Sequence, residues 1–398
     1  MKIKLAVLFG GRSVEHEVSV ISALQAMENL NADKYDIIPV YIGKNGEMYT
    51  GEALRDMDEY KNIPELLKKS IPVNFVIRDS KTMLVRKYAK KFGNNDITEV
   101  EVALPVVHGT NVEDGALQGY LRTLGLPFAG CDVLASAVGM DKYVMKAMLR
   151  DGGFPVLDSV RFRRSAYIDK DAVIAKIEEK VTYPVIVKPV NLGSSVGISK
   201  ASDRDGLVKS LDDAFLYADT VLVEKAVVKL REINCSVVGD PDSAEASECE
   251  EPFMCDEILS YKDKYMDGGK GAKGGSKGMA GLKRKVPADI SPELREKIRT
   301  LAVDAFKHLG CAGVSRIDFM IDDEDGSLYI NEFNTIPGSL AFYLWKPVGV
   351  SYTELLDKII NIALKRNRNE SEITYSFDSN ILSMGSARGA KGSKGAKA

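Results

Sequence analysis

Hydrophobic positions in the first part of the chain form short continuous runs that alternate with one longer periodic stretch. The runs KLAVLF (4–9), YDIIPVYI (35–42) and EVALPVVHG (101–109) are typical of buried strands, whereas VSVISALQAMENL (18–30) has helical periodicity. Strands that alternate with helices favour βαβ units. The pattern therefore predicts an α/β fold whose first domain contains a mostly parallel sheet.

The same alternation continues in a second unit that begins near Gly130. The segment DKYVMKAMLRDGG (141–153) is predicted to form a helix that ends at its glycines. The apolar segment YPVIVKPV (183–190) is predicted to form a strand of this unit.

A third unit is predicted to begin near Val221. It opens with the strand-like segments VLVEKAV (221–227) and REINCSVVGD (231–240). After residue 290, Ser291 and Pro292 supply an N-cap and a proline at the first position of a predicted helix.

The sequence pattern predicts two strands and a helix at the end of the third unit. GVSRIDFMID (313–322) and SLYINEFN (327–334) are predicted strands joined by the turn DEDGS, and SYTELLDKIINIALKR (351–366) is the predicted last helix.

Two segments rich in glycine and lysine interrupt or follow these units. Residues 261–285 have the composition of a flexible linker, and residues 367–398 are predicted to be a loose tail. The pattern as a whole predicts domains over residues 1–128, 129–220 and 221–366.

Composition narrows the possible functions. The 398-residue chain has a formal net charge of −3, which argues against a general nucleic-acid binder. No apolar stretch approaches the length of a membrane span, and the N-terminal run is too short for the core of a signal peptide. The five cysteines form no Cys-x-x-Cys pair, so reduced thiols in a cytoplasmic protein are expected.

The first candidate site is KPVNLGSSVG (188–197), which follows a predicted strand. Glycines let the backbone approach a phosphate, while Lys188, Ser194 and Ser195 can supply charge and hydroxyl donors for a nucleotide triphosphate. A tight hairpin with a surface lysine is the structural alternative.

The second candidate site lies on the two last predicted strands. Alternation places Arg316 and Asp318 on one face of the first strand, and Glu332 and Asn334 on one face of the second. If the strands pair, three oxygen-bearing side chains converge, which is the ligand chemistry that Mg²⁺ prefers. Arg316 could bind a phosphate beside them. A polar, solvent-facing side of the sheet is the alternative.

The third candidate site is GGRSVEHEVSVISA (10–23), where glycines precede a helix. Glu15 either binds an ammonium group or simply stabilises the start of the helix. His16 has a weak claim as a base, and His108 is more often structural than catalytic when it is considered alone.

Six ordered motifs together resemble the D-alanine–D-alanine ligase family of the ATP-grasp superfamily. They are GGRSVEHEVS, HGTNVEDGALQG, GMDKYVMK, VIVKPVNLGSSVG, VEKAVVKLREIN and RIDFMID…NEFNTIPG, and they extend the resemblance to about Arg366. The resemblance implies an N-terminal parallel-sheet α/β domain followed by two α+β subdomains that clamp ATP.

The resemblance also implies a reaction. D-alanine would be activated by ATP as an acyl phosphate and joined to a second D-amino acid, with D-alanine favoured and D-serine next, to supply peptidoglycan precursors. It further implies a cytoplasmic homodimer that binds neither nucleic acid nor membrane. Another dipeptide ligase and a non-enzymatic nucleotide-binding scaffold remain the alternatives.

Residue roles are carried over from the family motif by motif. Glu15 would receive the ammonium of the first substrate, and Arg316 and the Gly338 backbone would stabilise the oxyanion. Two Mg²⁺ ions, replaceable by Mn²⁺, would be held by Asp318, Glu332 and Asn334. The expected ATP-binding residues are Lys142, Lys188, Ser194, Ser195, Glu224, Lys225, Val227 and Glu232.

The glycine- and lysine-rich segment 261–285 then matches the lid of the family. Lys264 and Tyr265, together with Ser194, would be catalytic residues of the closed site. Water would hydrolyse an acyl phosphate, so the site must close for the reaction and open for product release.

Some positions depart from the usual family pattern. Val112 stands where a glycine is usual, and SLAFYLW (339–345) follows NTIPG. Tyr343 and Leu344 are expected near the second-substrate subsite, so these departures leave the identity of the second amino acid open.

Overall fold

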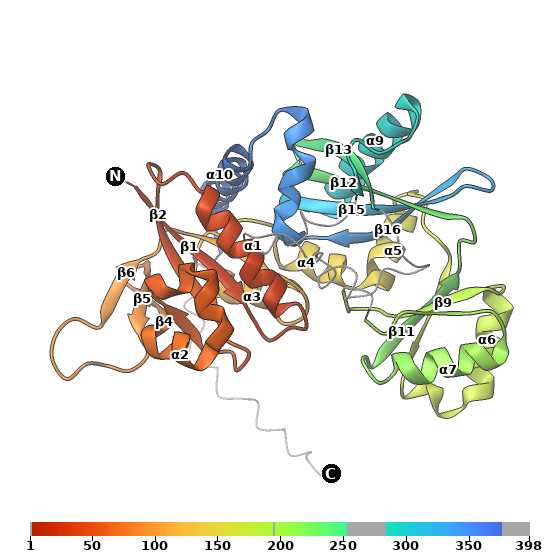
Figure 1. Cartoon of the computed structure of the whole chain (residues 1–398), viewed down its shortest axis with the longest axis horizontal. Helices are drawn as coiled ribbons and strands as arrows, with labels where there is room; N and C mark the ends of the chain where they lie inside the picture. The colour runs from red at the N-terminus through yellow and green to blue at the C-terminus, as the bar shows by residue number, and fades with distance from the viewer. Residues whose placement is uncertain (1, 194–195, 253–283, 376–398) are drawn as a thin grey trace, which may run out of the picture.

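The computed structural model describes residues 2–193, 196–252 and 284–375 (Figure 1). The predicted lid, apart from Arg284 and Lys285, and the tail beyond residue 375 lie outside the described residues. The described chain contains three sheets, one for each predicted unit.

The N-terminal sheet has seven strands and mixed pairing. Strand β1 (Ile3–Gly10) pairs in parallel with β2 (Tyr35–Ile42) and with β7 (Val102–Val107). The other four strands pair antiparallel in the order β6-β5-β4-β3-β2. They are β3 (Met48–Thr50), β4 (Ile71–Arg78), β5 (Lys81–Arg86) and β6 (Asp96–Glu99).

Four of the six strand pairings in this sheet are antiparallel, so the expectation of a mostly parallel sheet is wrong. The reason lies in the short connections, because a parallel pair needs a crossover of a dozen or more residues. Asp79 and Ser80 alone join β4 to β5, and both have positive φ, as a two-residue hairpin turn requires.

Helices α1 (His16–Asn29) and α10 (Tyr352–Ser371) link the N-terminal sheet to the C-terminal part of the chain. Helix α1 contacts β1 and β7, and α10 contacts α1, β7 and two strands of the C-terminal sheet. Their buried side chains share one hydrophobic core with the single tryptophan, Trp345. Helix α10 continues past Arg366, so the tail begins later than predicted.

The central sheet is antiparallel, with the order β10-β9-β11-β8. Its strands are β8 (Ser159–Arg163), β9 (Val185–Pro189), β10 (Ser199–Ala201) and β11 (Thr220–Lys225). Helices α6 (Lys170–Lys180) and α7 (Arg204–Ala214) pack on it and complete a separate small core. Because β11 belongs to this sheet, the central unit extends to Lys225, beyond the predicted boundary at residue 220.

The C-terminal sheet has the order β14-β13-β12-β15-β16 and is antiparallel. Its strands are β12 (Leu230–Gly239), β13 (Ala244–Pro252), β14 (Arg284–Lys285), β15 (Gly313–Asp322) and β16 (Ser327–Asn334). The bounds of β15 and β16 are those predicted from the sequence.

In the described chain, three helices besides α10 pack on the C-terminal sheet. Helix α9 (Pro292–His308) covers β12 and β13, with Ser291 as its N-cap as predicted. Helices α4 (Val133–Met140) and α5 (Lys142–Asp151) contact β16. Although α5 was expected in the central unit, its Met145 and Leu149 are buried in the C-terminal core.

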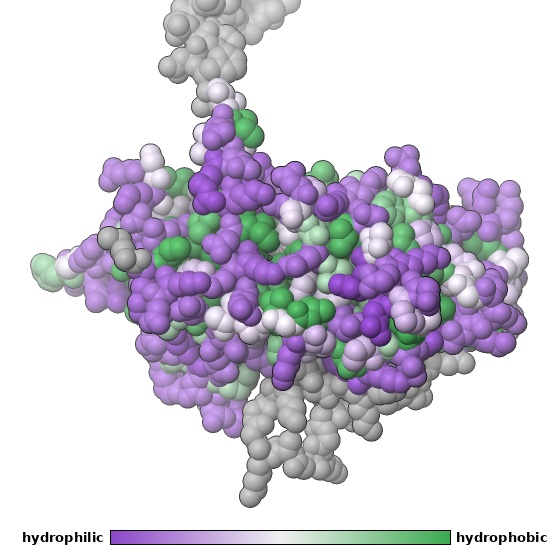
Figure 2. All heavy atoms as spheres, turned by 90° about the horizontal axis from the view of Figure 1, so that it is seen from above, coloured by the Kyte–Doolittle hydropathy of each residue, from purple (hydrophilic) through white to green (hydrophobic). Residues whose placement is uncertain are grey.

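The face of the molecule seen in Figure 2 is mostly hydrophilic, with hydrophobic residues in small scattered groups. Among the described residues, no helix has the length and apolar character needed to cross a bilayer.

Candidate active site

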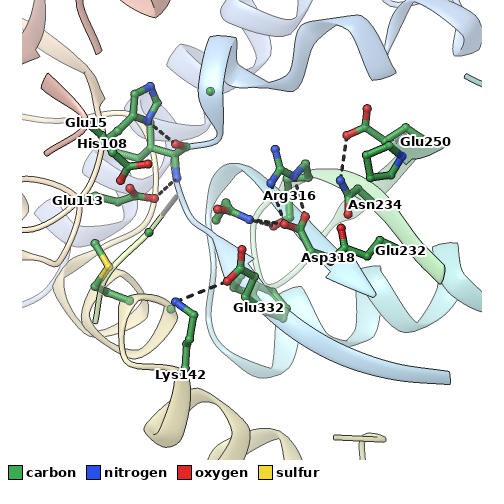
Figure 3. A pocket seen from close by; sticks show the side chains of 18 of the residues that line it. Glu15, His108, Glu113, Lys142, Glu232, Asn234, Glu250, Arg316, Asp318 and Glu332 are labelled. Carbon is green, nitrogen blue, oxygen red and sulfur yellow. Dashed lines mark hydrogen bonds and ion pairs between the residues drawn. The ribbon is translucent and has the colours of Figure 1, made fainter. Parts of the chain in front are cut away.

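A pocket lies between the N-terminal domain and the C-terminal sheet (Figure 3). The N-terminal domain contributes Glu15, His108 and Glu113, which lie across the pocket from the side chains of the C-terminal sheet. Other lining residues include Lys142, Gly193, Glu232, Asn234, Glu250, Arg284, Arg316, Asp318, Glu332, Asn334 and Gly338.

Pairing of β15 with β16 creates the oxygen cluster on one wall. The register places Asp318 opposite Glu332 and Arg316 opposite Asn334, so the predicted pairing is confirmed. The Asn334 amide donates to Asp318 over 3.0 Å. The side chains of Asp318 and Glu332 are 14% and 25% exposed, respectively, so they line a pocket and not an open face.

The chemistry of this wall fits Mg²⁺. Two carboxylates and one amide carbonyl supply hard oxygen ligands, and phosphate oxygens or water can complete the coordination. Within the described ranges, no three His, Cys, Asp or Glu side chains form a metal-binding group of their own.

Arg316 is held rigidly beside the cluster. Its Nε and Nη2 donate to the two oxygens of Asp318 over 2.6 and 2.7 Å. Burial opposes its charge, but the adjacent Asp318 outweighs burial and raises the pKa of Arg316 above its ordinary value. Arg316 is therefore a permanent, oriented cation of the pocket.

Lys142 lies at the first position of α5, where Asp141 caps the helix by accepting from two backbone amides. Its Nζ donates to the Leu192 carbonyl over 2.8 Å and lies 3.5 Å from Glu332. Lys142 thus joins the loop after β9 to the oxygen cluster.

A buried ion triad, Lys146–Glu224–Lys188, lies one helical turn from Lys142. Both lysines pair with Glu224, whose side chain is 2% exposed. Burial alone would raise the pKa of Glu224, but the two lysines outweigh it and lower the pKa to about 2. Burial lowers the pKa of Lys146 to about 8, so the triad carries a net positive charge at neutral pH.

The sequence motifs predicted that Lys188 and Glu224 bind ATP, but they indicated no role for Lys146. The available signal was spacing, because Lys146 follows Lys142 by four residues and so lies on the same face of the helix. Lys188 also donates to the Asn331 amide oxygen of β16 over 3.3 Å, which connects the central and C-terminal sheets.

Glu113 is a buried carboxyl that the sequence analysis did not single out. It accepts hydrogen bonds from the backbone amides of Gly109 (2.9 Å) and Ile336 (3.0 Å) and from the Thr335 hydroxyl (3.3 Å). Burial, followed by the charge of Glu15, raises the pKa of Glu113 to about 8.

Two glycines make room for Glu15. A Cβ atom at Gly193 would lie 2.7 Å from its Oε2 atom, and one at Gly109 would lie 2.9 Å away. A side chain at either position would therefore displace the Glu15 carboxylate, which lies against the loop that follows β9.

The two candidate histidines differ in position. His108 lines the pocket, contacts the Ile336 carbonyl (2.8 Å) and the Ser22 hydroxyl (3.0 Å), and is neutral because burial lowers its pKa to about 4. His16 lies behind the pocket between the Gly11 carbonyl and the Tyr41 hydroxyl. A structural role explains His16 fully.

The second-substrate candidates lie on the 3₁₀ helix η5 (Gly338–Leu344). The Tyr343 hydroxyl donates to Glu250 over 3.2 Å, and Leu344 is fully buried, so it does not reach the pocket surface. Val112 is also buried, and its methyl group lies 2.6 Å from where a Cβ of Gly11 would be.

The remaining predicted residues separate into two groups. Lys225 is exposed and Val227 partly buried, and neither lines the pocket. Ser194, Ser195, Lys264 and Tyr265 lie outside the described residues.

Two stretches of the chain match two family models. Residues 4–131 match the "D-ala D-ala ligase N-terminus" and residues 148–361 the "D-ala D-ala ligase C-terminus". The chain belongs to the D-alanine–D-alanine ligase family. It is therefore an ATP-dependent ligase that joins D-alanine to D-alanine in peptidoglycan synthesis and uses Mg²⁺.

Full-length relatives support the family assignment. The D-alanine–D-alanine ligase of Thermosipho melanesiensis is 36% identical over 383 residues, which cover 96% of this chain and 99% of the relative. The solved VanG D-Ala:D-Ser ligase from Enterococcus faecalis has a TM-score of 0.76 at 33% identity, covering 91% of this chain and 100% of its own. The D-alanine–D-alanine ligase from Coxiella burnetii has a TM-score of 0.74 at 28% identity, with coverage of 93% and 96%.

Proposed function

We propose that the pocket is the active site of the ligase, with Glu15 in the first-substrate subsite and Asp318, Glu332 and Asn334 as ligands of two Mg²⁺ ions. The supporting observation is that Glu15, Lys142, Arg316 and this oxygen cluster line one pocket although they come from separate parts of the chain. A retired nucleotide-binding scaffold would have no need to keep all of them together.

ATP is consumed here as a substrate. The carboxylate of the first D-alanine attacks the γ-phosphorus, ADP leaves and an acyl phosphate forms. The amine of the second D-alanine then attacks the acyl carbon, inorganic phosphate leaves and the amine loses a proton. Bound Mg²⁺ would neutralise phosphate charge during the first step.

The side chains of the pocket have separate tasks in this sequence. Glu15 binds the ammonium group of the first D-alanine, which aims its carboxylate toward the phosphate side of the pocket. Lys142 holds transferred phosphate oxygens beside Glu332, and Arg316 with the Gly338 amide stabilises the oxyanion that forms at the acyl carbon.

The nucleotide is expected beside the buried triad. Lys188 and Glu224 lie at the border of the central and C-terminal sheets. The net positive charge of the triad that they form with Lys146 favours a polyphosphate. Binding of adenine and ribose by Glu224, Lys225, Val227 and Glu232 remains a prediction from the family resemblance.

D-serine is the second candidate for the second amino acid. Its support is the likeness to the Enterococcus faecalis D-Ala:D-Ser ligase over 91% of this chain. A cytoplasmic homodimer remains the expectation from the family resemblance.

Phosphate release and dipeptide formation test this proposal together. The protein is incubated with ATP, Mg²⁺ and D-alanine, with D-serine added in a parallel reaction, and products are identified by mass. We expect one phosphate for each D-alanyl-D-alanine and a minor share of D-alanyl-D-serine. Phosphate release without a dipeptide would contradict the proposal, and a majority of D-alanyl-D-serine would favour the second candidate.

A further inference from the structure

The second amino acid brings a carboxylate that does not react. Removing that carboxylate from water is costly unless a charged donor receives it. Among the described residues, three cationic side chains line the pocket, namely Lys142, Arg284 and Arg316.

Two of these cations already contact the oxygen cluster on the side of the pocket where the phosphates of ATP are expected. Arg316 is bidentate to Asp318, and Lys142 lies between the Leu192 carbonyl and Glu332. Both therefore serve the oxygen cluster, where phosphate and metal are expected.

Arg284 belongs to another wall of the pocket. It lies on β14, which pairs with the end of β13, and its Nη1 donates to Glu250 over 2.7 Å. Its guanidinium carbon lies 3.9 Å from the centre of the Tyr343 ring. In Figure 3, Glu250 and its partner Asn234 lie across the pocket from Glu15 and Glu113, which belong to the first-substrate side.

We propose that Arg284 binds the carboxylate of the second D-amino acid, with Tyr343 and Glu250 as positioning residues. This inference rests on the proposed active site and names one of its subsites. A guanidinium has five donors in one plane, so it can keep its bond to Glu250 while it donates to a second carboxylate. Stacking on Tyr343 uses the face of the guanidinium and not the donors in its plane.

The surroundings of Glu250 favour this arrangement. Its carboxylate accepts from the Asn234 amide (3.1 Å) and the Tyr343 hydroxyl as well as from Arg284, so three donors share its charge. Burial, followed by the charge of Glu250, raises the pKa of Tyr343 to about 12, so the phenol stays neutral and adds no negative charge.

The same contacts revise the expected role of Tyr343. Its hydroxyl is used by Glu250 and its ring supports Arg284, so it acts on the second substrate through Arg284 and is not expected to bind it directly.

D-alaninamide provides the test, because it has an amine but no carboxylate and can therefore react only as the second substrate. The enzyme is given ATP, Mg²⁺, D-alanine and D-alaninamide, and the ratio of D-alanyl-D-alanine to D-alanyl-D-alaninamide is measured by mass. In Arg284→Met we expect this ratio to fall by about 10- to 100-fold, the loss of one charge-assisted contact. The product ratio of Arg284→Lys should lie between that of Arg284→Met and that of the unchanged protein. The KM for ATP should be the same in all three proteins.

Two further variants separate the positioning role from general damage. Tyr343→Leu removes the stacked ring and should also lower the ratio, whereas Tyr343→Phe keeps the ring and should lower it less. Lys285→Met is the matched control, because Lys285 is exposed and pairs with Asp289 outside the pocket.

An unchanged ratio in Arg284→Met, with dipeptide still formed, would overturn the inference and leave the proposed function intact. If Arg284→Met does not fold, an unchanged ratio in both Arg284→Lys and Tyr343→Leu overturns it equally. Absence of dipeptide from the unchanged protein would instead contradict the proposed function.

Discussion

Contacts between distant parts of the chain fix the positions of the single residues in this pocket. Glu15, Lys142, Arg316, Asp318, Glu332, Asn334 and Gly338 were predicted from motifs and all line the pocket. Four important side chains were not predicted: Glu113, Lys146, Glu250 and Arg284. Their roles depend on burial and on partners far away in sequence, and Arg284 adjoins a segment whose composition resembles a linker.

Glu113→Gln tests the carboxyl whose pKa burial raises. The folded pKa of about 8 lies above the unfolded value, so the folded state binds more protons between about pH 4.5 and pH 8. The free energy of unfolding should therefore fall as pH rises through this range. Gln cannot ionise, so the variant should lose much of this dependence.

The measurement is urea unfolding at pH 5.5 and pH 8. Glu28→Gln is the control, because Glu28 is exposed on α1 and should leave the difference between the two pH values unchanged. Equal pH dependence in Glu113→Gln and the unchanged protein would show that Glu113 is ionised throughout.

Glu332→Gln tests the oxygen cluster. The substitution keeps the size of the side chain but removes one charge from the proposed Mg²⁺ ligands. We expect kcat at limiting Mg²⁺ to fall by about 100-fold or more, comparable to the loss of one electrostatic stabiliser in other enzymes.

The control for this variant is Glu324→Gln at the exposed turn between β15 and β16, where Glu324 pairs with Lys229. Turnover at limiting Mg²⁺ is measured for both variants. Near-normal turnover in Glu332→Gln would remove Glu332 from the metal site.

Elements were predictable where local pattern and tertiary context agree. Strands β2, β15 and β16 were predicted with their observed bounds because long apolar runs end at clear turns. The antiparallel strands β3 to β6 were not predicted, since all four are only partly buried and β3 and β6 are also short. Assignment of β11 to the central sheet depends on pairing with β9, which no local signal encodes.

The 3₁₀ helix η5 is the clearest example of a local structure that depends on tertiary contacts and not on the local sequence pattern. Ser339, Leu340 and Ala341 have φ values of 52°, 52° and 50°, although none is a glycine. Left-handed backbone costs about 1–2 kcal/mol for each such residue. Tertiary contacts oppose that cost, because Leu340 and Ala341 are buried and the Ser339 amide donates to the Ser22 hydroxyl over 2.9 Å.

Ala341→Gly should therefore be tolerated better than the same change in a regular helix. The matched control is Ala302→Gly in α9, because both alanines are fully buried and lose the same methyl group. Glycine relieves strain at position 341 but weakens the helix at 302, so the difference in unfolding free energy should be about 2 kcal/mol. Equal losses in chemical denaturation would mean that the left-handed turn is not strained.

The described part of the molecule contains three hydrophobic cores that belong to two bodies. The larger body contains the N-terminal and C-terminal cores, and the smaller body contains the central core. The N-terminal sheet and α10 share a core with Val238 of β12 and Val314 of β15, so the N-terminal and C-terminal parts pack as one body. The central core is made only of residues between 160 and 223. Polar links, among them Lys146–Glu224 and Lys188–Asn331, connect the two bodies where ATP is expected.

This division predicts two unfolding transitions. The central core is small, so the central sheet should unfold at a lower urea concentration than the larger body. Trp345 is the only tryptophan and is buried in the larger body, with its indole donating to the Ser236 hydroxyl. Its fluorescence therefore reports that body alone, whereas circular dichroism reports both.

We expect circular dichroism to decrease before the fluorescence of Trp345 changes. ATP with Mg²⁺ should bring the two transitions together, because a ligand held by both bodies stabilises the weaker one by mass action. D-alanine alone is the control, since Glu15 belongs to the larger body and its ligand should leave the first transition in place. Coincident curves without ligand would mean that the polar links already make the molecule a single cooperative unit, and ATP would then not be needed to couple the central sheet to the rest.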